Sequence, residues 1–228
     1  MIDISYIAEV AALIGDPARA NMLFALKDEG TMSASELANV AGVAPNTASG
    51  HLAKLTTAGI LTVERKGRYR YYSLSGPEVA ETLEAIEVLA VDVSSPQRRP
   101  RPGDKALRYA RCCYDHLAGD LGVRITERYV QLGYIEQYDD GLTLTSDGAQ
   151  VFASLGVDIE KLKSGQRSLI RNCSDWSEKS FHLGGALAAA LFGQFTSVGW
   201  IQRVKGSNIV LVSQRGKSAL RESFGVEI

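Results

Sequence analysis

The chain has 228 residues, of which 45% are hydrophobic and 22% are charged, and its 25 basic and 26 acidic residues leave a formal net charge of −1. This composition excludes a disordered or fibrous protein, and the length predicts roughly two domains. A net charge near zero argues against a nucleic-acid partner only if the charge is evenly distributed along the chain.

Cysteine content and hydropathy favour a cytoplasmic protein without a membrane span. Three cysteines, two of them adjacent, are too few for a disulfide framework and fit a reducing compartment. The N-terminal residues carry Asp3 and Glu9 inside an apolar pattern and no basic cluster, which is unlike a signal peptide. Residues 182–201 contain no formal charge, but their large apolar side chains recur every four positions, as in a buried helix.

The charge is strongly segregated along the chain. Residues 44–72 contain five basic residues and one acidic residue, whereas residues 76–93 contain five acidic residues and no basic one. Residues 97–111 contain six basic residues and one acidic residue. Two basic segments therefore flank an acidic segment, and the net charge of the whole chain is no guide to its partners.

Capping residues mark the first helices of the chain. Asp16 can cap a helix that begins at Pro17, where the missing N–H has no helical partner to lose. Ser33 and Glu36 have the spacing of a capping box, and the short helix that they open ends at Gly42. These signals predict helices on both sides of residue 30.

A further helix begins after the turn at 42–44. It starts at Pro45 and ends at Gly59. Two short helices joined by a turn of three or four residues that contains Gly form a helix-turn-helix. Six apolar positions are spaced to form its common core: Leu37, Val40, Val43, Ala48, Leu52 and Leu55.

A β-hairpin is predicted next. Residues 60–65 and 69–74 are rich in β-forming residues and are separated by a basic Lys-Gly-Arg turn. Ser75 and Glu78 repeat the capping-box spacing and open a long helix to about Val93. A helix-turn-helix followed by a basic hairpin is a winged helix.

The second helix of this motif and the wing carry the candidate DNA-binding residues. A helix fits the major groove, where short polar side chains reach base edges, and basic residues of a wing contact phosphates or the minor groove. The alternative is a packing unit whose basic residues form a solvated face. The predicted DNA-binding set is Pro45, Asn46, Thr47, Ser49, Gly50, His51, Lys54, Arg65, Lys66, Arg68 and Arg70.

Five segments of this region carry motifs that are specific in combination. They are LIGDPAR at 13–19 with Leu23, ELA at 36–38, NTASGHLAKL at 46–55, AGIL at 58–61 and GRYRYY at 67–72. Across residues 5–93, these motifs closely resemble the ArsR/SmtB family of bacterial repressors. The resemblance implies a homodimer, joined through its first helix and the long helix after the wing, that binds a palindromic operator in double-stranded DNA. It also implies release of the operator on an inducing signal.

Two apolar helix faces support such a homodimer independently of the resemblance. Each face has more apolar residues than a domain of this size needs for its own core. The faces consist of Ile7, Val10, Ala11 and Ile14 in the first helix, and of Val79, Leu83, Ile86, Leu89 and Ala90 in the long helix.

The well-known metal sites of this family are absent from the sequence. Its arsenic and cadmium sensors carry cysteines in the helix before the recognition helix, whereas residues 35–41 contain no thiol. Its zinc sensors carry Asp and His ligands in the last long helix, whereas residues 80–93 contain acids but no His. The resemblance therefore does not identify the inducer.

A linker rich in Pro and Arg is assigned to residues 94–104. Its three prolines favour a stiff, extended chain. Its arginines, Arg98, Arg99 and Arg101, either follow a phosphate backbone or belong to a solvated tether. Both alternatives stay open.

The remaining residues contain an internal repeat. Residues 116–121 match residues 182–187 at an offset of 66, and a Gly-aromatic-Ile triplet, a strand-like segment and a Thr- or Ser-capped helix follow each copy. Each copy, at about 105–160 and about 161–228, resembles a degraded winged-helix unit without a basic recognition helix. Duplication without a DNA-binding face predicts a sensing or dimerising module.

This module contains all three cysteines and two of the three histidines. Cys113 and His116 are predicted three residues apart on a helix, so they share a face, and Glu178 and His182, four apart, do likewise. On a helix the vicinal Cys112–Cys113 pair is a poor disulfide. The candidate effector residues are Cys113, Tyr114, Asp115, His116, Cys173, Asp175, Trp176, Glu178 and His182. Three interpretations stay open: a structural core, an organic-effector pocket lined by Tyr114, His116, Trp176 and His182, or a metal- or thiol-redox-sensing set of Cys113, His116, Cys173 and His182.

The sequence thus predicts a mainly α protein with small β-hairpins (α+β). A winged helix-turn-helix at 1–93 and the linker precede a duplicated module at 105–228. We expect a homodimeric transcriptional repressor whose operator is released by an effector, either a small molecule or a metal ion, sensed in that module; no cofactor is certain. One alternative is a metal-, metalloid- or redox-responsive regulator that uses the Cys–His set, and another is an architectural DNA-bound dimer without a ligand. A rival enzyme, with Cys113 as nucleophile and His116 as base, has no phosphate loop, nucleophile elbow or carboxylate pair to support it, so we expect no enzyme.

Overall fold

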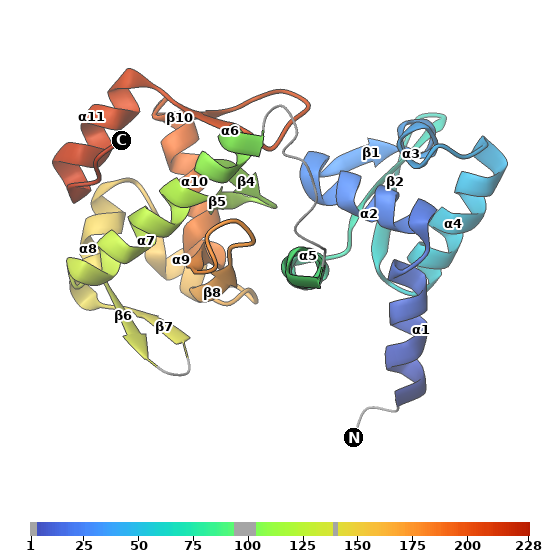
Figure 1. Ribbon diagram of the computed structural model, residues 1–228, viewed down its shortest axis with the longest axis horizontal. Coiled ribbons are helices and arrows are strands. Elements are labelled where there is room, and N and C mark those ends of the chain that lie inside the picture. The colour runs from blue at the N-terminus through green and yellow to red at the C-terminus, as the bar shows by residue number, and fades with distance from the viewer. Residues whose placement is uncertain (1–3, 94–103, 139–140) are drawn as a thin grey trace. The chain divides into compact units, whose positions relative to one another are not determined.

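The computed structural model describes residues 4–93, 104–138 and 141–228 (Figure 1). The chain divides into two compact units, the N-terminal unit, Met1–Leu83, and the C-terminal unit, Glu84–Ile228. The arginines of the predicted linker lie outside the described residues.

The N-terminal unit is the predicted winged helix-turn-helix. Its elements are α1 (Ile4–Ile14), α2 (Pro17–Glu29), β1 (Thr31–Ser33), α3 (Ala34–Ala41), α4 (Pro45–Thr57), β2 (Leu61–Lys66), β3 (Tyr69–Leu74) and the first turns of α5 (Pro77–Val93). β2 and β3 form the predicted antiparallel hairpin. β1 pairs with β3 in a sheet of order β1-β3-β2. This strand was not predicted, because three residues are too few to show a period of two.

The predicted caps hold the ends of these helices. The Asp16 carboxylate accepts a hydrogen bond from the Arg19 N–H at 3.0 Å, one turn into α2. Ser33 and Glu36 make the reciprocal bonds of a capping box at the start of α3, and this helix ends at Gly42 in the left-handed conformation. The hydrogen bonds from Ser33 lower the pKa of the Glu36 carboxyl.

The core of the N-terminal unit contains most of the predicted residues. Leu37, Leu52 and Leu55 are fully buried, whereas Val40 is 46% exposed. At 100° per residue, Leu37 and Ala38 centre the buried face of α3, and Val40 lies roughly 110° from that centre. The prediction for Val40 is therefore wrong.

The long helix α5 spans the division between the units. It begins at Pro77, so the predicted capping residue Ser75 lies two residues before the helix. Leu83, predicted for the dimer face, is fully buried within the chain. Glu84, which follows it, is the first residue of the C-terminal unit and is only 5% exposed.

The C-terminal unit has the order hairpin, helix, hairpin, helix twice. The first copy contains α6 (Asp104–Tyr109), β4 (Arg111–Cys113), β5 (His116–Ala118), α7 (Asp120–Gln131), β6 (Ile135–Tyr138), β7 (Gly141–Leu144) and α8 (Ser146–Ser154). The second contains α9 (Ile159–Lys163), β8 (Arg171–Ser174), β9 (Phe181–Gly184), α10 (Ala186–Ser197), β10 (Ile201–Arg203), β11 (Val210–Val212) and α11 (Gln214–Phe224). That each copy derives from a winged helix stays a prediction.

The first hairpin of each copy corrects the sequence analysis. Residues 111–118 form β4 and β5, and residues 171–184 contain β8 and β9. Cys113, His116 and His182 therefore lie on strands and not on helices. The helix expected within 182–201 is α10, which covers 12 residues, and no helix of the described residues is long and apolar enough to cross a membrane.

Two glycines explain why the copies resemble each other at the turn after this hairpin. Gly119 and Gly185 precede α7 and α10 and have φ angles of +81° and +93°. A Cβ at these positions would lie 2.6 Å from the Arg108 carbonyl oxygen and 2.8 Å from that of Ser168. The residue before each helix therefore lies so close to a neighbouring backbone segment that only glycine fits there.

The two copies share one hydrophobic core. Tyr129 of α7 packs its ring edge-on against Phe152 of α8 and Phe224 of α11, with ring centroids 4.9 and 5.0 Å apart. All three side chains are buried. Because a residue of the second copy completes the core of the first, the copies form one packed unit.

Candidate functional site

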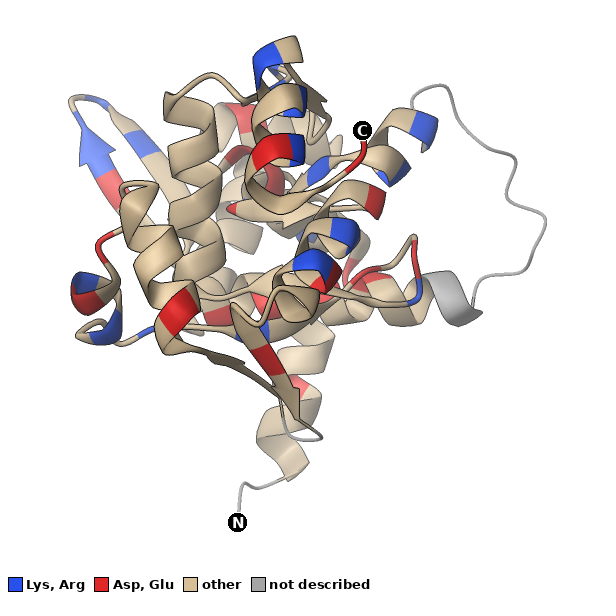
Figure 2. Cartoon of the chain, turned by 90° about the vertical axis from the view of Figure 1, so that its left-hand side faces the viewer, with Lys and Arg blue, Asp and Glu red and all other residues tan. Residues whose placement is uncertain are grey.

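The recognition helix and the wing present most of the predicted DNA-binding residues at the surface. Pro45, Asn46, Thr47, Ser49, Gly50 and Lys54 of α4 are exposed, as are Arg65, Lys66, Arg68 and Arg70 of the wing. The buried face of α4 consists of Ala48, Leu52 and Leu55. The tip of the β2–β3 hairpin forms a basic, blue segment in Figure 2. This surface has the polar and cationic groups that duplex DNA requires.

His51 departs from this pattern. Its Nδ1 lies 3.3 Å from Arg19 Nη1 and 3.8 Å from Asp16 Oδ1, and its side chain is only 17% exposed. Arg19 also donates hydrogen bonds to the carbonyl oxygens of Ala12 and Leu13. His51 thus ties α4 to the start of α2, which is a structural role within the unit.

The wing places two like charges opposite each other. Arg65 and Arg70 are cross-strand partners in the β2–β3 register. Like charges at such positions destabilise a hairpin by roughly 0.2–1 kcal/mol relative to neutral pairs. A bound phosphate would relieve this repulsion, so the arrangement favours an anionic partner.

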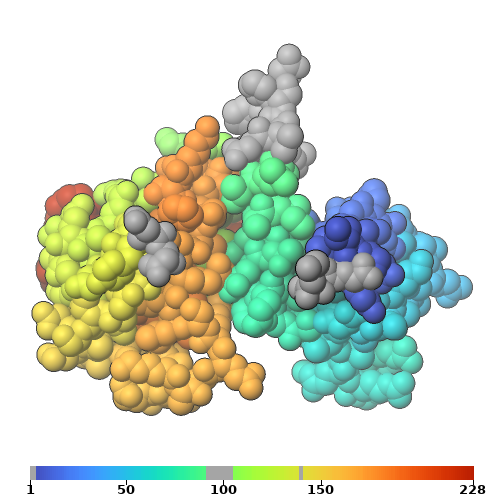
Figure 3. All heavy atoms as spheres, turned by 90° about the horizontal axis from the view of Figure 1, so that it is seen from below, coloured from blue at the N-terminus to red at the C-terminus, as the bar shows by residue number. Residues whose placement is uncertain are grey.

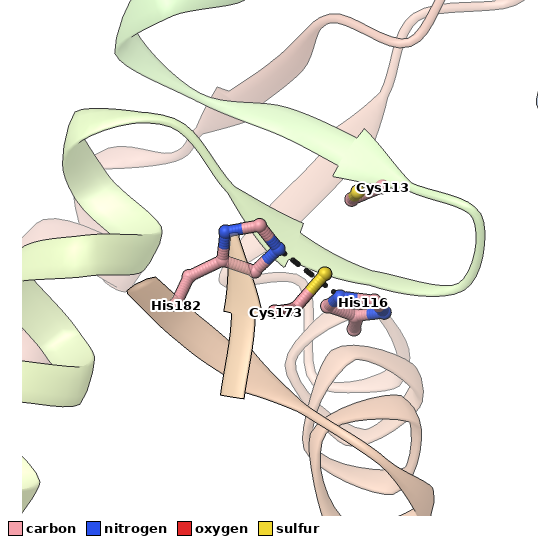
Figure 4. Close-up of side chains that lie close together, drawn as sticks. All are labelled: Cys113, His116, Cys173 and His182. Atoms are coloured by element: carbon pink, nitrogen blue, oxygen red, sulfur yellow. Dashed lines mark hydrogen bonds between the residues drawn. The ribbon is translucent and has the colours of Figure 1, made fainter. Parts of the chain in front are cut away.

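A second candidate site lies inside the C-terminal unit. Cys113 of β4, His116 of β5, Cys173 of β8 and His182 of β9 bring their ligand atoms within 4.8 Å of one another (Figure 4). We call these four residues the Cys–His cluster. All four side chains are buried. The structure therefore brings together the four residues that the sequence analysis singled out as a metal- or redox-sensing set.

Strand pairing explains this convergence. Cys113 is opposite His116 in the β4–β5 register, and Cys173 is opposite His182 in the β8–β9 register. Opposed residues of a hairpin share a face, and successive residues point to opposite faces. Accordingly, Cys112 belongs to the large hydrophobic core, and its Sγ donates to the Tyr114 carbonyl oxygen at 3.3 Å. Each hairpin contributes one Cys–His pair.

The two imidazoles of the cluster face each other. The Nε2 atoms of His116 and His182 lie 3.1 Å apart, as the dashed line in Figure 4 shows. Their Nδ1 atoms face carboxylates, with His116 Nδ1 3.2 Å from Asp115 Oδ1 and His182 Nδ1 3.0 Å from Asp175 Oδ2. The hydrogen bond to Asp115 orients the His116 ring. His182 Nδ1 is close to Asp175, but the geometry of the contact is not that of a hydrogen bond.

Both carboxylates are held by arginines. Asp115 accepts two hydrogen bonds from Arg167, at 2.5 and 3.1 Å. Asp175 accepts hydrogen bonds from Arg111 at 2.9 Å and from the Gly119 N–H at 2.7 Å. Burial by itself would raise the pKa of both carboxyls, but their histidine and arginine neighbours outweigh it and hold both pKa values below the usual range.

The carboxylate beside His116 also changes the titration of that histidine. Burial favours the neutral ring, but the hydrogen bonds to Asp115 and Cys113 outweigh burial and raise the pKa of His116 to about 9. His116 is therefore positively charged at neutral pH, with a proton on each ring nitrogen.

The two thiols share one carboxylate. Cys113 Sγ donates to Glu84 Oε1 at 2.8 Å, and Cys173 Sγ donates to Glu84 Oε2 at 3.1 Å. Arg171 Nη2 lies 3.7 Å from the same carboxylate. The hydrogen bond with Cys173 and burial together hold the pKa of the Cys113 thiol well above its usual range. A thiol in this state is a poor nucleophile.

Three of the predicted effector residues lie apart from the cluster. Tyr114 occupies the turn between β4 and β5 with a φ of +59°. Trp176 stacks on the guanidinium of Arg111, 4.4 Å from its ring centroid, and Glu178 is exposed. Glu84 was not predicted for this site, because it is 29 and 89 residues from the two cysteines and its acidic segment has the pattern of a solvated helix face.

Comparisons with known proteins identify the class of this chain. Residues 14–64 match a family described as a helix-turn-helix domain. The chain is 36% identical over 222 residues to the HTH-type transcriptional regulator YdfF of Bacillus subtilis, an alignment that covers 97% of this chain and 98% of that protein.

Other similar proteins match a shorter part of the chain. The arsenic resistance transcriptional regulator ArsR1 of Pseudomonas putida is 36% identical over 81 residues, which cover 36% of this chain and 62% of that protein. The crystal structure of NolR from Sinorhizobium fredii is 27% identical, covers 38% of this chain and 85% of its own, and has a TM-score of 0.35.

Proposed function

Because the chain belongs to the ArsR-type family of winged helix-turn-helix transcriptional regulators, we propose that it is a homodimeric repressor whose operator binding is controlled by an effector of its C-terminal unit. Each protomer of the dimer binds one half of a palindromic operator. α4 enters the major groove, and the wing contacts the phosphate backbone or the minor groove.

The exposed face of α4 together with the wing carries this proposal. Asn46 and Thr47 are exposed in the first turn of α4, where side chains reach base edges. Arg65, Arg68 and Arg70 are exposed on the wing. Bidentate contact of an Asn with adenine discriminates against other bases by about 1–3 kcal/mol, whereas phosphate contacts add affinity without sequence information.

The first helix supports the homodimer. α1, dark blue in Figure 3, has no buried residue. Its Ile4, Tyr6 and Ile7 are among the exposed large apolar side chains of the described residues, and Ile4 is 79% exposed. An apolar helix face of this kind is stabilised by burial, and the corresponding face of a second copy would bury it with twofold symmetry.

The enzyme alternative has less support than regulation. The relatives are named as transcriptional regulators. The nucleophile that the enzyme alternative needs is Cys113, whose thiol is buried and has a raised pKa. Thiol catalysis requires a partly exposed thiolate of lowered pKa.

A gel-shift experiment with the DNA upstream of the chain's own gene tests the proposal. We expect sequence-specific binding that weakens with salt. Asn46→Ala should lose about 1–3 kcal/mol of binding free energy. Arg68→Ala should reduce the slope of log K against log salt concentration by about one. Lys205→Ala, which removes an exposed lysine from the turn between β10 and β11, is the matched control and should change neither quantity. Binding unchanged by the combined Asn46→Ala and Arg68→Ala substitutions would refute the proposal.

A further inference from the structure

We propose that the Cys–His cluster binds a thiophilic divalent cation of the Zn²⁺ type, and that this cation is the effector because it displaces Glu84 of α5 from the two thiols. The regulatory part of this inference rests on the proposed function, whereas the metal site itself does not.

The donor atoms of the cluster are close to the separation that a metal site needs. With Zn–S distances of about 2.3 Å and Zn–N distances of about 2.0–2.1 Å, neighbouring ligand atoms of a tetrahedral site lie roughly 3.3–3.8 Å apart. In the cluster all four atoms lie within 4.8 Å of one another, and the two Nε2 atoms are 3.1 Å apart. Shifts of a few tenths of an ångström to about one ångström would complete the site.

The orientation of the imidazoles is that of metal ligands. A ligating histidine ordinarily donates its second ring N–H to a carboxylate, which fixes the ring and increases its basicity. His116 and His182 each direct Nδ1 at a carboxylate, and arginines hold both carboxylates in place. The 3.1 Å contact between the two Nε2 atoms is a hydrogen bond in the metal-free protein, with the proton on the charged ring of His116. A bound cation would take the place of that proton, with both Nε2 lone pairs directed at it.

The donor set selects the class of metal. Two thiols and two imidazoles suit Zn²⁺ and its softer congeners, whereas Mg²⁺ and Ca²⁺ require oxygen ligands. The sequence contains no C-x-x-C motif or similar ligand spacing that would identify the site. The β4–β5 and β8–β9 hairpins instead supply one Cys–His pair each, so folding of the duplicated unit assembles the site.

Glu84 connects the site to α5, the helix that begins in the winged helix-turn-helix unit. Its carboxylate accepts hydrogen bonds from both thiols. When the two metal–sulfur and two metal–nitrogen bonds form, two protons from the thiols and one from the charged ring of His116 pass to water, so both hydrogen bonds to Glu84 are lost. The buried carboxylate then faces two metal-bound sulfurs that donate no hydrogen bond to it, which destabilises its present position. α5 begins in the N-terminal unit, so a shift of Glu84 is carried along a continuous helix.

Metal binding is tested first on the full chain without DNA. The reduced protein is titrated with Co²⁺ under nitrogen, and Zn²⁺ is then added to displace the Co²⁺. We expect one Co²⁺ per chain, with the intense visible and thiolate charge-transfer absorption of a tetrahedral site that has two sulfur ligands. The absence of stoichiometric binding, or a spectrum without sulfur ligation, overturns the site.

Variants then assign the ligands. Cys173→Ala and His182→Gln should each weaken Zn²⁺ binding by at least about a hundredfold. Cys112→Ser is the matched control, because Cys112 is a buried neighbour of Cys113 on the opposite face of the hairpin, and it should retain the metal. Circular dichroism of each variant shows whether it folds. If a variant does not fold, the Co²⁺ spectrum of the unsubstituted protein still shows whether the metal has sulfur ligands.

The regulatory step is tested by operator binding with and without Zn²⁺. We expect Zn²⁺ to weaken operator binding by about tenfold or more, within the usual range of allosteric coupling. In Glu84→Gln, Zn²⁺ affinity should not fall, but the operator response should shrink to less than about threefold. A full response in Glu84→Gln overturns the role of Glu84, and a metal-bound wild-type protein with unchanged operator affinity overturns the effector role. DNA binding without metal binding refutes this inference and leaves the repressor intact. Metal binding without DNA binding refutes the proposed function together with the regulatory part, and leaves the metal site intact.

Discussion

The candidate DNA-binding surface and the Cys–His cluster place their polar groups in different surroundings. On α4 and the wing, nearly all the candidate side chains are exposed to water. In the cluster, the two buried imidazoles each lie beside a carboxylate, and the two buried thiols donate to Glu84. Removing one exposed group should therefore change stability by no more than about 1 kcal/mol. Removing one buried group leaves its partners without hydrogen bonds, so it should change stability by more than this.

The largest expected effect comes from Asp175→Ala. Arg111 and Asp175 have side chains that are 5% and 0% exposed, and the substitution leaves the arginine charge and the Gly119 N–H unpaired. Breaking a buried ion pair in this way costs about 3–5 kcal/mol. We expect a loss of this size in the free energy of urea unfolding.

Asp120→Ala is the matched control for Asp175→Ala. Asp120 pairs with Arg124 at 3.2 Å on the exposed face of α7, one turn apart. Pairs of this kind contribute about 0.3–0.5 kcal/mol. If Asp175→Ala costs no more than this control, the distinction between buried and exposed groups fails.

An intermediate effect is expected from pH in the metal-free protein. The pKa of His116 is about 9 in the folded protein, against 6.5 for the ordinary side chain. Since the folded value is the higher one, the stabilisation is complete below about pH 6.5 and is lost as the pH rises through about 9. The shift corresponds to at most about 3 kcal/mol.

Unfolding free energies measured between these pH values should therefore decline for the metal-free wild-type protein. In His116→Gln this decline should be absent. A wild-type profile that is flat or rises over this interval contradicts the arrangement of His116 and Asp115.

The smallest expected effect has the opposite sign. Arg65→Thr removes one of the two like charges that face each other on the wing and places a β-branched residue in a strand. We expect the N-terminal unit to gain about 0.2–1 kcal/mol, measured by thermal unfolding, while operator affinity falls. Glu64→Thr, on the adjacent exposed position of β2, is the control and should not raise stability in this way. Loss of stability in Arg65→Thr would indicate that the arginine is structural.

Local signals in the sequence determined the N-terminal unit. The caps at Asp16 and Ser33, the Gly42 turn and the basic hairpin each act within a few residues, and the structure contains the helices and hairpin that they predict. The misses have local reasons as well. β1 has three residues, and Val40 lies at the edge of the buried face of a short helix.

The structure of the C-terminal unit could be predicted only in part from local sequence signals. The repeat of His116 and His182 was visible, and so was the set of cysteines and histidines, but a helical spacing was assumed for Cys113 and His116. Three-residue strands are too short to show their period, so the hairpin that pairs these residues could not be recognised.

The sequence by itself determined the family, the winged helix-turn-helix and the residues that are able to face DNA, because these depend on contacts within a few residues along the chain. Only the tertiary structure decided that Cys113, His116, Cys173 and His182 converge, that Asp115 and Asp175 lie beside the two rings, and that Glu84 accepts hydrogen bonds from both thiols. Those contacts join residues up to 89 positions apart. They exist because two hairpins pack into one core, and no local pattern in the chain encodes that packing.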